Sequence, residues 1–481
     1  MEIEQIEADY LVIGAGASAM AFVDAMLAES DATFVMVDRR HAPGGHWNDA
    51  YPFVRLHQPS SYYGVASKPL GRDRIEEDGF NKGFRELATG TEVTNYFHKL
   101  MTDVFLPSGR VQFFPLSDAS ADANGSGEIT SLLSGERRRV KINKKLVDAT
   151  LLNTNIPLTH KRQFAVADDV VCVPPNDLPR RAPSHAHFAV LGAGKTAIDA
   201  VCWLLENGAA PESISWVLPR DPWLINRMQS QPGLEFFERA VGGVATQVEI
   251  AATAKTIDDL CERMNAEKLW LRLSDDVWPT MIHGATITEL ELEQLKRVPN
   301  TIRKGRVKAL EPGRIVLDEG EAWVPANALF VDCTARALAS IANGATPIFG
   351  SEKISLQMVR QYQPTFSAAL IGHIEARIDD EAHKRRLTQV APMTDTVEDW
   401  VKMQVISMTN QYMWSHDEAV IEWIVGCRLD PFLKTMRTVT EDDQVKFEIM
   451  RRMRENAPLA AQNLQRLAQQ ADGAAALAQP A

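Results

Sequence analysis

The sequence predicts an α/β fold in which a strand–glycine turn–helix–strand unit occurs twice, followed by a helical C-terminal region. Residues 10–13 read as a buried strand, residues 14–19 as a tight glycine turn that opens a helix, and residues 33–37 as the next strand. The same order returns from His187. After about residue 380 the composition shifts to helix-forming and aromatic residues. With 481 residues, 45% of them hydrophobic, the chain is long enough for two or three domains.

Charge and cysteine usage exclude several classes of protein. The net charge of -12 comes without a long basic stripe, which argues against nucleic acid as a partner. The five cysteines are far apart and include no C-x-x-C pair, which argues against a disulfide scaffold, a zinc ribbon and a redox pair and favours a reducing cytoplasm. Neither a signal peptide nor a membrane-length apolar run is visible, so no membrane association is expected.

The first glycine turn has the pattern of a dinucleotide site. Gly14 permits the sharp turn, Gly16 lets the backbone approach a pyrophosphate, and the small Ala19 lets the helix lie close to the strand. The helix N-terminus faces the phosphate charge, and Asp38 at the end of the next strand is placed to accept hydrogen bonds from a ribose. Arg39 is assigned to the same site. The alternative is an ordinary strand-to-helix turn, which the flanking strands and the carboxylate make less favourable.

The second turn repeats this pattern with Gly192, Gly194 and Ala197. Its second strand does not end in a carboxylate but leads into Arg220, whose guanidinium suits the 2′-phosphate of NADP better than a bare ribose hydroxyl. Lys195 would add charge beside the pyrophosphate. The alternatives are a solvated surface arginine and a solvated lysine in the first helical turn. The sequence therefore favours NADP over NAD here.

A P-loop is the competing interpretation of residues 194–196, which read Gly-Lys-Thr. Its first glycine would fall at position 189, which is Ala189, and the loop between strand and Gly194 is too short to wrap phosphates. A nucleoside triphosphatase is therefore disfavoured.

The remaining chain predicts further strands and a helical end. Residues 145–150 and 329–335 are related hydrophobic strands ending in Asp-(Ala/Cys)-Thr, residues 304–320 read as a hairpin, and residues 111–142 have room for another. The helical region carries Trp400, Trp414 and Trp423 in apolar periodic stretches. From Ala457 onward the tail is rich in Ala and Gln and is expected to be an exposed or frayed helix.

The order of these features resembles the two-dinucleotide-domain flavoproteins, most closely the flavin-containing, Baeyer-Villiger and N-hydroxylating monooxygenases. The resemblance covers roughly residues 9–376 and includes, besides the two turns, the Gly-Gly-x-Trp-like stretch of Gly45, His46 and Trp47, residues 51–60, and the returning segment 364–373. It implies two Rossmann-like domains, with FAD on the first turn and NADPH on the second. The implied division is a first part of the FAD domain, an NADP domain, a return segment of the FAD domain and the helical region, at residues 1–182, 183–330, 331–380 and 381–481.

Two departures from the family pattern leave the chemistry open. The family fingerprint ahead of the second turn is absent from residues 155–187, and His57 stands where Baeyer-Villiger members carry an aspartate. His57 and Gln58 are the polar candidates for catalysis beside the flavin, because histidine titrates near neutral pH; a structural histidine is the alternative. Trp47, Tyr62 and Tyr63 are candidate pocket walls or core aromatics.

The leading functional prediction is an NADPH-dependent, FAD-containing monooxygenase that acts on a small organic substrate. The alternatives are an FAD-dependent oxidoreductase or oxidase without oxygen insertion, and a non-catalytic protein that senses NADP(H). No close His/Cys/acidic cluster predicts a metal site, and a homo-oligomer is compatible with the sequence.

Overall fold

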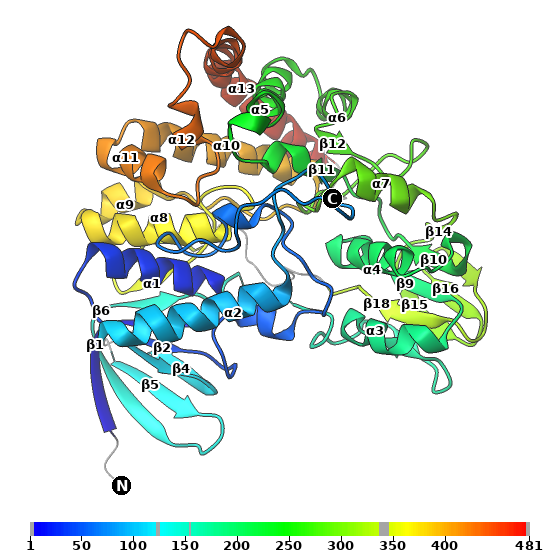
Figure 1. Cartoon of the computed structure of the whole chain (residues 1–481), viewed down its shortest axis with the longest axis horizontal. Helices are drawn as coiled ribbons and strands as arrows, with labels where there is room; N and C mark the ends of the chain where they lie inside the picture. Colours follow the sequence, from blue (N-terminus) through cyan, green and yellow to red (C-terminus); the bar gives the residue numbers. More distant parts are fainter. Residues whose placement is uncertain (1–3, 122–125, 153–154, 336–345, 478–481) are drawn as a thin grey trace.

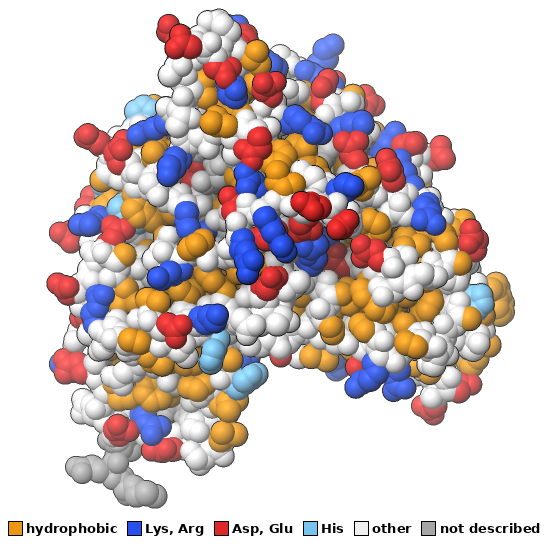
Figure 2. All heavy atoms as spheres, viewed as in Figure 1, with side chains coloured by type: hydrophobic (Ala, Val, Ile, Leu, Met, Phe, Trp, Pro, Cys, Tyr) orange, Lys and Arg blue, Asp and Glu red, His pale blue; other side chains and the backbone are white. Residues whose placement is uncertain are grey.

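The computed structural model of the chain describes residues 4–121, 126–152, 155–335 and 346–477. Two sheets, one mixed and one parallel, lie on opposite sides of the view in Figure 1, and the C-terminal helices cover the top. On the face seen in Figure 2, acidic and basic side chains are interspersed. None of the helices in the described ranges is long and apolar enough to cross a membrane.

The first sheet has the strand order β3-β2-β1-β6-β5-β4, with β19 also paired to β6. Its strands are β1 (Glu4–Ile13), β2 (Phe34–Val37), β3 (Val111–Phe114), β4 (Ser117–Ala121), β5 (Ser126–Ser131), β6 (Arg137–Asp148) and β19 (Lys353–Ser355). Strands β3, β2, β1, β6 and β19 run parallel, whereas β4 and β5 form an antiparallel extension of β6. The strands expected within residues 111–142 are therefore confirmed.

Two helices from distant parts of the chain pack together over this sheet. Helix α1 (Ala17–Glu29) follows the first glycine turn, and α8 (Pro364–Arg377) is the returning segment. A Cβ atom added at Gly372 would lie 2.8 Å from the Phe22 carbonyl oxygen, so this glycine permits the close approach of α8 to α1. The returning segment thus completes the core of the first sheet, as the resemblance implies.

The second sheet is entirely parallel, with the order β14-β10-β9-β18-β8. Its strands are β8 (Cys172–Val173), β9 (Phe188–Leu191), β10 (Ile214–Val217), β14 (Asn300–Ile302) and β18 (Leu329–Asp332), and helix α4 (Lys195–Glu206) follows β9. The predicted hairpin is β15 (Val307–Glu311) and β16 (Arg314–Leu317), extended by β17 (Gly320–Trp323) and by β7 (Ala165–Val166). A small third sheet joins β11 (Leu224–Asn226), β12 (Trp270–Leu271) and β13 (Thr286–Ile287).

The repeated Asp-(Ala/Cys)-Thr segments occupy equivalent places in the two parallel sheets. Asp148 accepts hydrogen bonds from the backbone N–H of Thr150 at 3.0 Å and from its hydroxyl at 2.6 Å. Asp332 accepts the same pair from Thr334, at 3.0 and 2.7 Å. These side chains fix the backbone where each strand leaves its sheet. Each turn lies against a glycine turn, because the N–H that follows the aspartate donates to the last residue of the neighbouring strand, at 3.0 Å in both sheets.

The other helices are α2, α3, α5, α6, α7 and α9 to α13. Their bounds are α2 (Gly90–Leu100), α3 (Leu178–Arg181), α5 (Phe237–Thr253), α6 (Ile257–Ala266), α7 (Glu289–Lys296), α9 (Glu381–Leu387), α10 (Val397–Ser415), α11 (Glu418–Gly426), α12 (Leu433–Met436) and α13 (Gln444–Leu477). Trp400 and Trp414 are buried in this region, and Trp423 packs against the core of the first sheet. The helical end is therefore confirmed, whereas the domain boundaries stay a prediction.

The helix expected in the tail is confirmed, but one of its faces is buried, which the sequence analysis did not predict. Helix α13 continues to Leu477 and buries Ala460, Leu464 and Leu467. Asn463 donates to the carbonyls at the end of α5, at 2.8 Å to each of two oxygens. Sparse apolar residues at helical spacing were enough for one buried face, because the facing helix supplies the rest of the apolar surface.

Candidate active site

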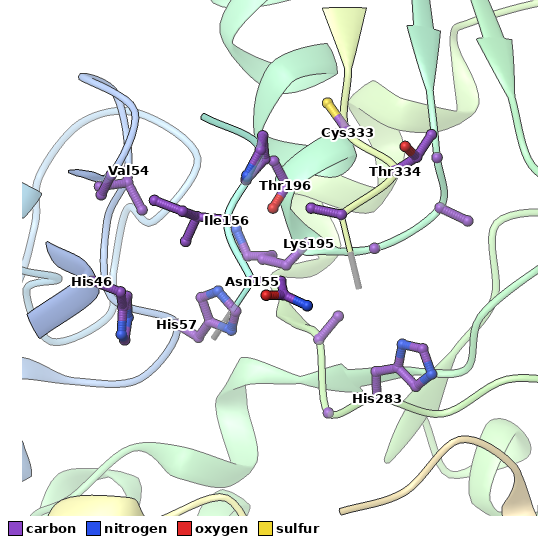
Figure 3. Close-up of a pocket in the computed structure, with 18 of the residues that line it drawn as sticks. His46, Val54, His57, Asn155, Ile156, Lys195, Thr196, His283, Cys333 and Thr334 are labelled. Atoms are coloured by element: carbon purple, nitrogen blue, oxygen red, sulfur yellow. The ribbon is translucent and has the colours of Figure 1, made fainter. Parts of the chain in front are cut away.

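A cavity of about 1030 Å³ opens where β9, β10 and β18 end. The loops that follow the first glycine turn supply one wall, and the second glycine turn supplies the opposite wall. In Figure 3, His46 and Val54 lie on one side, Thr196, Cys333 and Thr334 on another, and His57, Asn155 and Lys195 between them. Ligands of parallel α/β sheets bind at the carboxyl ends of the strands, which is the place of this cavity.

The first glycine turn is built as its sequence predicts. Gly14 has φ of +102° and donates its N–H to the Val37 carbonyl at 2.7 Å. Gly16 is the N-cap of α1, and no side chain caps the free N–H groups of that helix. The Asp38 carboxylate accepts the N–H groups of Ala15 at 2.7 Å and Arg40 at 2.8 Å, so it also holds the turn in shape. Ala19 is fully buried, as close packing of helix and strand requires.

The Gly44-Gly45 loop lies directly on this turn. Gly44 donates to the Ala15 carbonyl at 2.8 Å, and a Cβ atom at Gly45 would come within 2.9 Å of the Gly16 Cα. The chain then enters the cavity with His46 stacked on Trp47 at 5.5 Å between ring centroids. Burial, together with the charge of a nearby arginine, lowers the pKa of His46 to about 4.

Aromatic side chains form the wall around this entry. The Trp47 indole N–H donates to the Tyr63 hydroxyl at 2.8 Å, and the Tyr62 hydroxyl donates to the Ser230 carbonyl at 2.9 Å. All three predicted aromatic wall residues line the cavity, and Trp47 and Tyr63 also pack against the core of the first sheet.

The second turn is more open than the first. Gly192 has φ of +123°, and a Cβ atom there would lie 2.6 Å from the Cys333 carbonyl oxygen. Gly194 is the N-cap of α4, again without a side-chain cap, and no heavy atom lies within 4 Å of the place where its Cβ would be. Ala197 is fully buried. The turn therefore leaves free space beside uncapped N–H groups, which suits an anion.

Lys195 lines the cavity, but its charge is shared within the protein. Its ammonium donates to Asp199, and the Glu291 carboxylate lies 3.9 Å away. The second Asp199 oxygen accepts the Tyr51 hydroxyl at 2.7 Å. The sequence analysis predicted Lys195 as a partner of pyrophosphate. Asp199 lies one helical turn further on, at the spacing of an ordinary ion pair, whereas nothing in the sequence indicated Glu291.

His57 and Gln58 both line the cavity. Burial, with the charges of Lys195 and Arg227 nearby, holds the pKa of His57 well below its usual value, so its ring is neutral at neutral pH. The His57 carbonyl accepts a hydrogen bond at 3.0 Å from Arg227, which is 1% exposed and pairs with Glu291 at 2.8 Å. A buried ion pair between Arg227 and Glu291, far from His57 in the sequence, thus positions the backbone of His57.

Arg220 follows β10 and lines the cavity. Its guanidinium donates to both carboxylate oxygens of Asp395, at 3.1 and 2.6 Å, and the His283 imidazole lies 2.6 Å from one of them. The strand tip itself lacks a carboxylate, as predicted, but the chain supplies one from 175 residues further on.

The predicted site residues fall into two groups. One group lines the cavity: His46, Trp47, His57, Gln58, Gly192, Gly194, Lys195 and Arg220. The second group is outside the described lining of the cavity: Gly14, Gly16, Ala19, Asp38, Arg39, Gly45 and Ala197. Arg39 is exposed and pairs with Asp118 at 2.6 Å, so the structure shows it bonded to a surface carboxylate. Within the described ranges no group of three or more His, Cys, Asp or Glu side chains is arranged to hold a metal ion.

Comparison with known proteins places the chain in a family and identifies its fold. No family model matches it. It resembles a solved structure of a polycyclic ketone monooxygenase from Thermothelomyces thermophila, with a TM-score of 0.50, 12% identity, and coverage of 90% of this chain and 86% of that one. A flavin-containing monooxygenase from Stenotrophomonas maltophilia gives a TM-score of 0.45 at 13% identity, covering 77% of this chain and 98% of that one. The first of these likenesses shows that the chain shares the α/β fold of that structure.

Sequence similarity defines the family more closely. The uncharacterized proteins Rv2000 of Mycobacterium tuberculosis and Mb2023 of Mycobacterium bovis are each 38% identical to this chain over 462 residues, which is 96% of this chain and 84% of theirs. The chain belongs to the family of these mycobacterial proteins.

Proposed function

We propose that the protein is an FAD-containing, NADPH-dependent oxidoreductase that oxygenates a small organic substrate. One observation carries the proposal: in each of two sheets a strand with parallel neighbours leads into a glycine turn whose helix N-terminus has no side-chain cap, and a cavity connects the loop of the first turn with the second. Uncapped N–H groups beside glycine fit a pyrophosphate at each turn. The monooxygenase-type fold supports the same reading.

The residues of the first turn fit the adenosine half of FAD, and the loop of Gly45, His46 and Trp47 leads from that turn into the cavity. Gly192, Gly194 and Arg220 would hold NADPH on the opposite wall. When bound, the flavin would supply the redox chemistry, accepting hydride from NADPH and passing reducing equivalents to oxygen.

The chain itself would contribute exclusion of water and proton handling. Trp47, Tyr62 and Tyr63 present a mainly apolar wall, which limits the access of water to the reacting atoms. His57 is held neutral, so its ring nitrogens can accept one hydrogen bond and donate another at neutral pH. Arg227 fixes its backbone, and His57 would thereby hold or move a proton at one defined place in the cavity.

Electron transfer without oxygen insertion is the second candidate. The missing fingerprint in residues 155–187 favours it, because the monooxygenases that the sequence resembles carry that motif ahead of the second turn. A cytoplasmic location is proposed for either activity.

The test begins with the purified, full-length protein. Released, noncovalent FAD and saturable NADPH binding are expected, and a colourless protein that also fails to take up added FAD would refute the proposal. Oxygen and NADPH consumption are then measured with amines, sulfides and ketones. Oxygenated product in proportion to NADPH supports the monooxygenase, whereas anaerobic turnover of a substrate supports the second candidate.

A further inference from the structure

An ion pair whose partners come from distant segments lines the cavity beyond β10. Arg220 follows β10, and Asp395 precedes helix α10 of the C-terminal region. The two contacts of 3.1 and 2.6 Å make a bidentate pair, the strong geometry for a guanidinium and a carboxylate. His283, the third group, lies 2.6 Å from the same carboxylate, and all three side chains line the cavity.

The backbone around Asp395 is fixed, whereas its side chain is held only by these two partners. The Asp395 carbonyl accepts the N–H of Ile282 at 3.0 Å, and its own N–H donates to Asp399 at 3.1 Å. The Thr394 hydroxyl donates to the Ile282 carbonyl at 2.6 Å. The carboxylate is 43% exposed, so it can rotate away from Arg220 without disturbing its own segment.

The Asp395 carboxylate changes the contacts that a bound nucleotide can make at Arg220. A 2′-phosphate brings about two negative charges and would have to displace Asp395 from Arg220 or lie beside it. A ribose 2′-hydroxyl, by contrast, can donate a hydrogen bond to the carboxylate, as it does where an acidic residue ends the second strand of a dinucleotide fold. Asp395, from the segment just before α10, can therefore perform the role that the strand tip leaves open.

We propose that Asp395 determines the dinucleotide preference of the second glycine turn, by competing with the 2′-phosphate of NADP(H) for Arg220. The inference rests on the proposed function, since it requires a dinucleotide at that turn. It makes the helical C-terminal region a contributor to the nucleotide site. It also predicts that the preference for NADPH provided by Arg220 is smaller than that of an unpaired arginine.

The experiment measures binding of NADP⁺ and NAD⁺ by calorimetry to the full-length protein and its variants. Asp395→Asn should tighten NADP⁺ about tenfold and leave NAD⁺ unchanged or weakened. Arg220→Ala should weaken NADP⁺ about tenfold and alter NAD⁺ little. Asp275→Asn is the matched control, because it removes one carboxylate whose side chain is 76% exposed and which does not line the cavity.

The outcomes separate the two proposals. If both nucleotides bind and Asp395→Asn changes neither affinity relative to Asp275→Asn, the role of Asp395 is refuted and the nucleotide site stands. If neither nucleotide binds any variant, the proposed function fails and the inference fails with it. Thermal unfolding identifies the variants that remain folded. If Asp395→Asn does not fold, Asp395→Ser takes its place in the binding experiment.

Discussion

The two glycines of the second turn provide a matched pair of substitutions that separates folding from nucleotide binding. A methyl group at Gly194 meets no heavy atom within 4 Å, and the residue has an ordinary φ of -82°. Gly194→Ala should therefore cost about 1 kcal/mol or less, the difference between glycine and alanine at an N-cap. Gly192→Ala places its methyl 2.6 Å from a backbone oxygen at φ of +123°, and should cost about 2 kcal/mol or more.

For nucleotide binding the order should be reversed, with the larger loss in Gly194→Ala. The Gly194 methyl would project into the free space where the proposed pyrophosphate lies, so NADP⁺ affinity should fall about tenfold or more while the melting temperature changes little. Gly192→Ala should mainly lower the melting temperature. Calorimetric binding and thermal unfolding of both variants provide the measurement. A folded Gly194→Ala protein that binds NADP⁺ as tightly as the parent would show that the dinucleotide does not lie on this turn.

Three further predictions follow from the same structure. Gly16→Ala, whose methyl would meet its nearest neighbour at an ordinary 3.6 Å, should leave the fold intact but lower FAD content in the purified protein; unchanged FAD content would contradict the assigned site. His57→Gln should reduce NADPH-driven turnover about a hundredfold while NADP⁺ affinity holds, and equal loss of both would make His57 a structural residue. The pKa of His46 is lowered to about 4 in the folded protein, so as pH falls the unfolded chain takes up a proton at this residue before the folded protein does. The free energy of unfolding should therefore drop between about pH 6.5 and 4. For this half-buried ring the drop should be no more than about 3 kcal/mol. The free energy of unfolding, measured with denaturant at each pH, should depend less on pH in this window for His46→Gln.

Local patterns in the sequence predict the turns and strand ends that residues close together in the chain form. The turns at Gly14 and Gly192 could be predicted because sharp turns, close backbone approach and strand–helix packing each demand a small residue at fixed spacing. The strand ends at Asp148 and Asp332 could be recognised as related, because an Asp-x-Thr turn is made within three residues.

The charged partners within the site could not be predicted in this way. Arg227 and Glu291 form a buried pair across 64 positions, and Arg220 and Asp395 meet across 175. Contacts of this kind depend on how the third sheet and helix α10 pack against the second glycine turn, and no spacing rule specifies that packing. A charged residue in a loop looks solvated in the sequence, and only the fold shows which ones face one another.

The electrostatics of the cavity follow from these pairs. Lys195 and Arg220, which line the cavity, and the buried Arg227 beside His57 each have a carboxylate partner within 4 Å. An isolated buried cation would be costly, and the pairing with a carboxylate offsets that cost. An anionic ligand that binds one of these three cations therefore competes with a carboxylate. Among the three carboxylates, Asp199 and Glu291 are nearly buried and accept further hydrogen bonds from Tyr51 and Thr288. Asp395 also contacts His283, but it is 43% exposed. Displacement of the carboxylate is therefore easiest at Arg220, where the 2′-phosphate is expected. It is hardest beside His57, where the proposed proton transfer needs charges that stay in place.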